Sequence, residues 1–325
     1  MATVTVPPTI PQPTQDCQQL RNAFSLGRGG TDERKVIEIL AHRKGENRKD
    51  ICHTYVMLYK EDLKQRMRLE LTKDLERSIV WWMTDPVELD AQLAREALRS
   101  WSTDYRVIIE TACCQSTEEL LNVRKEYQAL YNQSLEEDIA WETNGGTQKL
   151  LVALATAYRY TGPVVNMTVA KLEAEQLYGG GEGKTDGIDE DLFVRILGTR
   201  SFGHLNAVFD HYKELYGHDI NKGLKEKHAG EMGAVIRTTI KCINRPARYF
   251  AKVLNLCLKG LQEGRRSEEK SLTRIVVTRA EIDMQRIKAE FIGKYGRPLE
   301  NAIKDATVGN HRSFLLHLIG SEDDI

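Results

Sequence analysis

The chain has 325 residues, of which 41% are hydrophobic and 29% are charged, and its formal net charge is −1. This composition is typical of a globular protein, and the near-zero charge excludes the overall positive field that attracts nucleic acid, so we expect no nucleic-acid partner. An anionic partner would need a local basic patch or a bridging cation. No apolar run approaches the roughly 20 residues that a membrane-spanning helix requires.

The first segment, residues 1–15, is predicted to be an extended arm. It is rich in proline and threonine, and it lacks the basic start and the long apolar run of a secretory signal. The six cysteines include no Cys-x-x-Cys pair, which argues against zinc and against a disulfide framework. We therefore expect a protein of the reducing cytoplasm.

Four copies of one pattern follow the arm. In each copy an aromatic residue is followed four residues later by a tyrosine and four residues after that by leucine or isoleucine; the tyrosines are Tyr59, Tyr131, Tyr216 and Tyr295. Sixteen residues before these tyrosines stand Arg43, Gln115, Arg200 and Arg279. Agreement at several fixed offsets indicates an internal repeat, and we expect the tyrosines to pack in the core.

Each copy is predicted to be helical. Val36, Ile37 and Leu40 follow the i, i+3, i+4 spacing, and there is little sustained alternation of the kind that predicts strands. We expect an all-α array of four repeats with four or five short helices each. The predicted repeats are 16–86, 87–162, 163–250 with a linker at its start, and 251–325. The predicted N-caps are Thr31, Thr103 and Ser267.

The glycine-rich loop 25–33, "SLGRGGTDE", stands at the start of a predicted helix. Such a loop can turn amides toward a phosphate or carbonyls toward a cation. Glu70 lies 40 residues after Gly30, at a predicted junction between two later helices. A carboxylate facing loop carbonyls suits a hard cation such as Ca²⁺, which takes six to eight oxygen ligands, and a single carboxylate implies weak affinity, on the order of 10⁻⁴–10⁻³ M.

The four repeats, the loop of the type Gly-x-Gly-Thr-Asp/Glu and the acid about 40 residues downstream resemble the annexin family, in particular its plant branch. The resemblance covers the chain from about Asp16 onward. It implies a slightly curved disc of four five-helix repeats, with calcium loops on the convex face that bind acidic phospholipid membranes peripherally.

In repeat 1 the resemblance implies calcium ligands from the loop carbonyls of Arg28 and Gly30, with Leu26 or Gly27, and from the Glu70 carboxylate. Arg28 replaces the family's first loop glycine. It could instead contact lipid phosphate directly, as cationic side chains do.

In repeat 2 the corresponding residues are Ser100, Ser102 and Glu142. The loop glycines are absent, but Glu142 lies 40 residues after Ser102, as Glu70 does after Gly30. Trp101 stands at the loop tip, where annexins often present an apolar residue to the bilayer, and an indole suits the membrane interface. The alternative is a tryptophan folded back onto its own repeat.

Repeats 3 and 4 have lost the acid. Lys227 occupies its position in repeat 3 and cannot ligate Ca²⁺, and Ala306 occupies it in repeat 4. The basic loop of repeat 4, with Arg265 and Arg266, could contact an anionic surface electrostatically, at about 1 kcal/mol per cation. Its alternative is a solvated loop.

Other motifs are weaker. The run 178–186, "YGGGEGKTD", has Tyr178 where a phosphate loop needs its first glycine. By resemblance, His42 matches a position discussed for peroxidase activity in plant annexins, and Cys113 and Cys242 match a pair discussed for redox roles. Asp90 matches an acid at the annexin centre, and Gln115 stands in place of the arginine that this acid usually faces. For His42 we expect a structural role.

We therefore predict a calcium-dependent, peripheral phospholipid-binding protein that is not an enzyme and is a monomer or weak oligomer. The alternative is a scaffold with degenerate calcium sites that binds lipid or actin largely without calcium. Liposome binding with calcium or with chelator separates the two.

Overall fold

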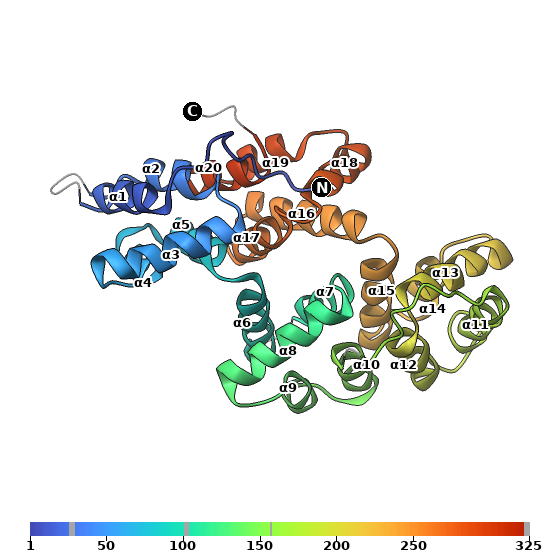
Figure 1. Cartoon of the computed structure of the whole chain (residues 1–325). Helices are drawn as coiled ribbons and strands as arrows, with labels where there is room; N and C mark the ends of the chain where they lie inside the picture. Colours follow the sequence, from blue (N-terminus) through green and yellow to red (C-terminus); the bar gives the residue numbers. More distant parts are fainter. Residues whose placement is uncertain (26–29, 101–103, 157, 322–325) are drawn as a thin grey trace. The chain divides into compact units, whose positions relative to one another are not determined.

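The computed structural model of the chain describes residues 1–25, 30–100, 104–156 and 158–321 (Figure 1). Within these residues there are twenty helices and no strand. The all-α prediction is therefore confirmed. No helix in this part of the chain is both long enough and apolar enough to cross a bilayer.

The helices fall into four consecutive groups of five, as the repeat pattern predicted. Those of repeat 1 are α1 (Pro13–Ala23), α2 (Glu33–Leu40), α3 (Gly45–Tyr59), α4 (Leu63–Glu70) and α5 (Lys73–Met83). Those of repeat 2 are α6 (Pro86–Arg99), α7 (Tyr105–Cys113), α8 (Thr117–Tyr131), α9 (Leu135–Glu142) and α10 (Gly145–Ala155). Those of repeat 3 are α11 (Met167–Gly180), α12 (Glu190–Thr199), α13 (Phe202–Tyr216), α14 (Ile220–Lys227) and α15 (Glu231–Asn244). Those of repeat 4 are α16 (Pro246–Gln262), α17 (Glu268–Arg279), α18 (Met284–Tyr295), α19 (Leu299–Ala306) and α20 (Gly309–Leu318).

The chain divides into two compact units. One contains Met1–Pro86 and Ala247–Ile325, which carry repeats 1 and 4, and the other contains Val87–Pro246, which carries repeats 2 and 3. In the first unit, the buried guanidinium of Arg48 in repeat 1 is 2.7 Å from the Glu281 carboxylate in repeat 4. The first unit therefore combines the first and last repeats of the sequence, and the second unit combines two repeats that are adjacent in sequence.

The segment expected to be an extended arm docks onto the first unit. Thr3 donates its amide to the Ala280 carbonyl at 2.9 Å and its hydroxyl to the Leu318 carbonyl at 2.7 Å. Helix α1 begins at Pro13, so the last three residues of the predicted arm are helical. Proline is favoured at a first helical position because it has no amide hydrogen to satisfy there. The stretch expected to be a linker before repeat 3 likewise contains α11.

The repeated tyrosines lie at the edge of the core rather than inside it. Tyr59, Tyr131, Tyr216 and Tyr295 are half-buried, whereas the aromatic residue four positions earlier in each repeat is fully buried. The two rings of each pair are 4.8 to 5.0 Å apart, one helical turn from each other. The prediction of core packing therefore holds for the pair as a unit, and the buried member is the preceding ring.

In repeats 1 and 2 the helix after the loop is capped one residue later than predicted, whereas in repeat 4 the N-cap is Ser267, as predicted. In repeat 1 the N-cap is Asp32, whose carboxylate accepts the Lys35 amide at 3.0 Å. Asp104 and Asp189 do the same in repeats 2 and 3, whereas Ser267 precedes α17 without a side-chain cap bond. A carboxylate caps better here because it also complements the positive helix end. This leaves the Thr31 hydroxyl available for another partner.

Candidate calcium site in the repeat loops

Glu70, the acid predicted for repeat 1, faces the loop from which it is separated by 40 residues of sequence. It is the last residue of α4, and its Oε2 accepts a hydrogen bond from the Thr31 hydroxyl at 2.8 Å. The neighbouring Gly30 has φ +83°, a left-handed conformation that suits glycine. The structure thus places the Glu70 carboxylate beside Thr31, at the C-terminal end of the loop. The other predicted ligands of this loop, Leu26, Gly27 and Arg28, lie outside the described residues.

The other oxygen of Glu70 is held by an arginine that sequence analysis did not single out. Arg66 Nη2 lies 2.9 Å from Glu70 Oε1, and the two side chains are 29% and 26% exposed. The signal was visible in the sequence, because residues four apart on a helix are neighbours. A cation that binds Glu70 must compete with this guanidinium.

The turn after Glu70 is fixed from two other parts of the chain. Glu33, in the first turn of α2, accepts the Thr72 amide at 2.7 Å through one carboxylate oxygen and the Asn310 side chain at 2.6 Å through the other. Because these residues come from repeats 1 and 4, no local pattern could have revealed the arrangement. Its effect is to hold the carboxylate-bearing turn against the start of α2.

In repeat 2 the acid also meets an arginine. Glu142 ends α9, and its Oε1 is 2.9 Å from Nη1 of Arg99, the residue that directly precedes Ser100. The Asp104 amide donates to the Ala97 carbonyl at 3.2 Å and closes the loop, and the Ser100 hydroxyl donates to the same carbonyl at 2.9 Å. The structure thus brings Glu142 to the beginning of the loop. Trp101 and Ser102 lie outside the described residues.

In repeat 3 the left-handed glycine of the loop is retained without the acid. Gly187, which lies 40 residues before Lys227 as Gly30 does before Glu70, has φ +80°. Ile188 stands in the place of Thr31, and the Lys227 side chain is exposed. The carbonyl of Gly181, in the same connection, lies 2.9 Å from Nε2 of His228. This loop has neither the carboxylate nor the hydroxyl that meet in repeat 1.

In repeat 4 the basic loop is exposed. The Arg265 side chain is 56% exposed and lies 3.0 Å from a carboxylate oxygen of Glu263, and Arg266 is exposed as well. Asp305, one residue before Ala306, is paired with Arg297 at 2.6 Å. The loop therefore offers two accessible guanidinium groups, each with an acidic residue nearby: Glu263 for Arg265 and Glu269 for Arg266.

A cation at Glu70 would be held by main-chain oxygens and one carboxylate, not by a cluster of side chains. In the four described stretches of the chain, no group of three or more His, Cys, Asp or Glu side chains is arranged to hold a metal ion. A hard cation at Glu70 would therefore depend on one carboxylate and on main-chain oxygens, with water or a ligand in the remaining positions.

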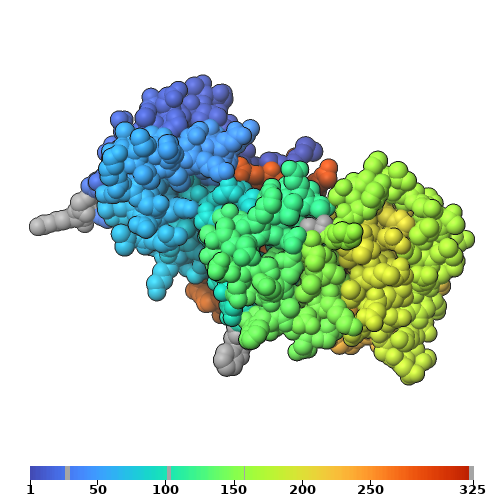
Figure 2. All heavy atoms as spheres, turned by 60° about the horizontal axis from the view of Figure 1, so that its bottom comes forward, coloured from blue at the N-terminus to red at the C-terminus, as the bar shows by residue number. Residues whose placement is uncertain are grey.

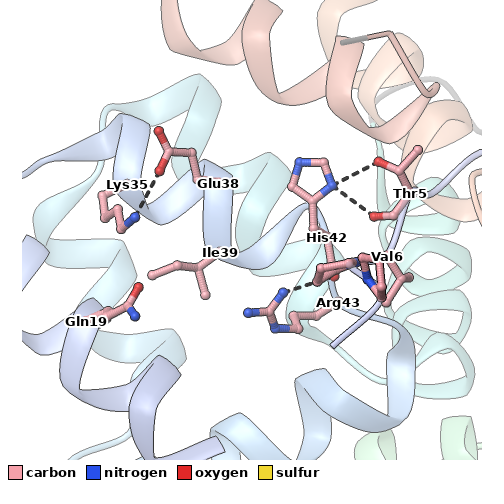
Figure 3. A pocket seen from close by; sticks show the side chains of 10 residues that line it. Thr5, Val6, Gln19, Lys35, Glu38, Ile39, His42 and Arg43 are labelled. Atoms are coloured by element: carbon pink, nitrogen blue, oxygen red, sulfur yellow. Dashed lines mark hydrogen bonds and ion pairs between the residues drawn. The ribbon is translucent and has the colours of Figure 1, made fainter. Parts of the chain in front are cut away.

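His42 lies at a pocket of about 460 Å³ between the arm and helices α1 and α2 (Figure 3). Its Nδ1 lies 3.0 Å from the Thr5 hydroxyl and 2.9 Å from the Thr5 carbonyl, and its Nε2 lies 3.1 Å from His317 Nδ1. Both ring nitrogens thus have protein partners. These contacts support the structural role expected for His42, which is to hold the arm against repeats 1 and 4.

Cys113 and Cys242, the two cysteines matched by resemblance, are both buried, and a third cysteine contacts Cys242. Cys114 Sγ, not Cys113, lies 3.9 Å from the carbonyl oxygen of Cys242. Burial raises the pKa of Cys113 and of Cys242, so these two thiols are poor sources of the reactive thiolate. Gln115, which replaces the expected arginine, donates its side-chain amide to Asp90.

A known family model matches the chain four times, once in each repeat. The family model for annexins matches residues 15–82, 89–154, 173–237 and 249–318. The chain is 44% identical to annexin Gh1 of Gossypium hirsutum over 319 residues, which is 98% of this chain and 99% of that protein. It is 41% identical to annexin D7 of Arabidopsis thaliana over 322 residues, 99% of each. The solved structure of annexin III superposes with a TM-score of 0.91 at 31% identity, over 99% of this chain and 98% of that one.

The fold and the loops define an all-helical four-repeat protein in which a distant carboxylate faces a loop at a helix start. With these matches, the chain belongs to the annexin family and is of the plant type. Annexins bind calcium, generally associate through it with acidic phospholipid membranes as peripheral proteins, and are generally binding proteins rather than enzymes.

Proposed function

We propose that this annexin binds acidic phospholipid membranes in a calcium-dependent manner, mainly through the loop of repeat 1 and Glu70. The observation that carries the proposal is the 2.8 Å hydrogen bond between the Thr31 hydroxyl and Glu70 Oε2 beside the positive φ of Gly30. A carboxylate at the loop would repel a phosphate that bound alone, whereas it attracts a cation. Calcium then joins the two negative groups, because its remaining coordination positions can accept a lipid phosphate oxygen.

The proposed ligands in repeat 1 are the carbonyls of Leu26 or Gly27, Arg28 and Gly30 together with the Glu70 carboxylate. Repeat 2 would supply a weaker site from Ser100, Ser102 and Glu142, since its loop lacks glycine. The proposed membrane contacts are Arg28, Trp101, Arg265 and Arg266. The protein would reside in the cytoplasm as a monomer or weak oligomer and reach the membrane when calcium rises.

Co-sedimentation with vesicles of phosphatidylcholine and phosphatidylserine tests the proposal. Glu70→Gln keeps the size of the side chain but removes its charge, and we expect it to raise the calcium needed for half-maximal binding by about tenfold. Glu142→Gln should have a smaller effect. Glu226→Gln is the matched control, because Glu226 is an exposed acid next to Lys227, in a turn without the site.

Binding that is unchanged by Glu70→Gln would contradict the calcium site. Vesicle binding that persists fully in chelator would instead favour a scaffold that contacts lipid through its basic loops. In that case co-sedimentation with actin filaments would be the next measurement, since actin is the other partner expected of such a scaffold.

A further inference from the structure

Two apolar side chains, each directly before one of the proposed calcium-binding acids Glu70 and Glu142, are unusually exposed. Leu69 is 81% exposed and Trp141 is 83% exposed. Leu69 directly precedes Glu70, and Trp141 directly precedes Glu142. Single exposed apolar residues are common on protein surfaces and need no explanation by themselves. The position of these two in the repeat is what distinguishes them.

The residue before the acid position differs in kind among the four repeats. The two repeats that keep the acid have a large apolar residue before it, whereas the two that have lost the acid have a charged residue there: Glu226 before Lys227 and Asp305 before Ala306. Glu226 and Asp305 are also exposed. The apolar side chain therefore accompanies the carboxylate and is absent where the carboxylate is absent.

The backbone that carries Trp141 is held on both sides. The Gln148 side chain donates to the carbonyls of Ala140 at 2.6 Å and Thr143 at 3.0 Å, and the Thr143 hydroxyl donates to the Ile139 carbonyl at 2.5 Å. The green part of the chain, to which α9 belongs by its residue numbers, lies on the face that Figure 2 brings forward. The indole is thus presented to solvent from a fixed turn.

Leu69 is presented in the same way. Met67 and Leu71, on either side of it, are buried, and the following turn is tied to Glu33 through the Thr72 amide at 2.7 Å. The helix can therefore not rotate Leu69 inward without exposing its two apolar neighbours. In both turns the outward orientation is a consequence of the packing and not of a free loop.

The nature of the partner follows from the size of the apolar surface. Each turn offers one apolar side chain flanked by polar groups, whereas a specific protein partner normally buries a contiguous apolar centre. A lipid headgroup layer can accept a single side chain, and tryptophan in particular favours that depth. Calcium bound at the adjacent carboxylate would bring the phosphates of such a layer to the same turn.

We propose that Leu69 and Trp141 are apolar anchors that enter the headgroup region of an acidic phospholipid bilayer beside the calcium site of their own repeat. This inference rests on the proposed function. It adds an apolar contact on the turn that carries the acid, besides the contact expected from Trp101 at the loop tip.

Vesicle binding of matched serine variants tests the proposal. At fixed calcium we expect Trp141→Ser to lower the affinity for phosphatidylserine vesicles about tenfold and Leu69→Ser about fivefold. The controls are Tyr158→Ser and Met57→Ser, which replace side chains that are 83% and 59% exposed but do not adjoin an acid of this kind. The controls should bind as the unaltered protein does. Calcium binding without vesicles should be unchanged in all four variants, because none of them removes a carboxylate.

Quenching by brominated phospholipid reports on insertion itself. Calcium-dependent quenching of tryptophan fluorescence should persist in Trp101→Phe and fall in Trp141→Phe, which keeps an apolar ring but removes the indole. If the unaltered protein binds vesicles with calcium while the serine variants match their controls and Trp141→Phe leaves quenching unchanged, the anchors are wrong and the calcium function stands. If vesicle binding needs no calcium but still depends on Leu69 and Trp141, the anchors stand and the calcium function fails.

Discussion

At their C-terminal ends, the loops of repeats 1 and 3 share a glycine conformation and a capping contact but differ in their side chains. Gly30 and Gly187 occupy equivalent positions with φ values of +83° and +80°, and the residue two places after each glycine caps the following helix. The amide of that capping residue donates to the carbonyl of Ala23 in repeat 1 and of Gly180 in repeat 3, at 2.9 and 2.7 Å. Yet Glu70 and Thr31 meet in repeat 1, whereas repeat 3 has Lys227 and Ile188.

This comparison separates the requirements of the fold from those of the site. The left-handed glycine is retained where no acid remains, so the loop conformation serves the helix connection whether or not a cation binds. A glycine-rich loop alone therefore does not indicate a metal site. The carboxylate across the loop is the feature that distinguishes the two repeats.

The largest effect should come from restoring the acid in repeat 3. Lys227→Glu replaces a cation with a carboxylate at the end of a helix whose facing loop has the same left-handed glycine as repeat 1. Calorimetric titration should then show one additional calcium ion bound, with a dissociation constant on the order of 10⁻⁴–10⁻³ M. Lys225→Glu makes the same change in net charge on the same helix, and an equal gain in that variant would mean that the position has no special role.

The basic loop of repeat 4 should make the next largest contribution. Replacing both Arg265 and Arg266 with Gln removes two exposed cations, each contributing about 1 kcal/mol near an anionic surface. We expect vesicle affinity to fall about tenfold at low salt, less than the full sum because Arg265 has Glu263 beside it. The difference should vanish at high ionic strength, where such attraction is screened. A loss of vesicle affinity that is independent of salt would contradict a local electrostatic contact. The same holds if Lys125→Gln, which replaces an exposed cation on α8, lowers the affinity equally.

Removing the hydroxyl next to Glu70 should have a moderate effect. Thr31→Val keeps the shape of the side chain but loses the 2.8 Å hydrogen bond to the carboxylate, a bond that typically contributes about 1 kcal/mol. We expect the calcium needed for vesicle binding to rise about threefold. Thr199→Val, which removes a hydroxyl bonded to the Arg195 carbonyl of its own helix, is the control. An unchanged calcium requirement in Thr31→Val would show that the hydroxyl does not position Glu70.

The smallest effect should be a gain of calcium affinity when Arg66 is replaced. Arg66→Gln removes the guanidinium 2.9 Å from Glu70 Oε1, with which calcium must compete. Because the pair is partly exposed, its contribution is below about 1 kcal/mol, and we expect calcium affinity to rise about twofold at low salt. Weaker binding in this variant would mean that Arg66 orients the carboxylate for the ion instead of competing with it.

The sequence predicted those features that depend on short-range or repeated patterns. The all-α array of four repeats followed from the spacing of aromatic and apolar residues, and the five helices of each repeat and the approach of Glu70 to the loop followed from the resemblance to annexins. Arg66 could have been found from its place one turn before Glu70. The N-caps of repeats 1 and 2 were predicted one residue too early, because threonine and aspartate are both good capping residues and the carboxylate adopts that role here.

Other parts of the site could not be predicted, because they combine residues that are distant in sequence. Glu33 reaches Asn310 across 277 positions, and Arg99 reaches Glu142 across 43. Such contacts depend on how the repeats pack, and no local periodicity encodes them. The exposure of Leu69 and Trp141 is of the same kind, since hydrophobic residues in a helix are normally expected to face the core.

The most direct test is a crystal structure of the protein grown with calcium. The account predicts anomalous density about 2.3–2.6 Å from a carboxylate oxygen of Glu70 and from carbonyl oxygens of the loop, with Arg66 displaced from the carboxylate and no density opposite Lys227. Crystals that contain calcium elsewhere while Glu70 remains bonded only to Thr31 and Arg66 would contradict it.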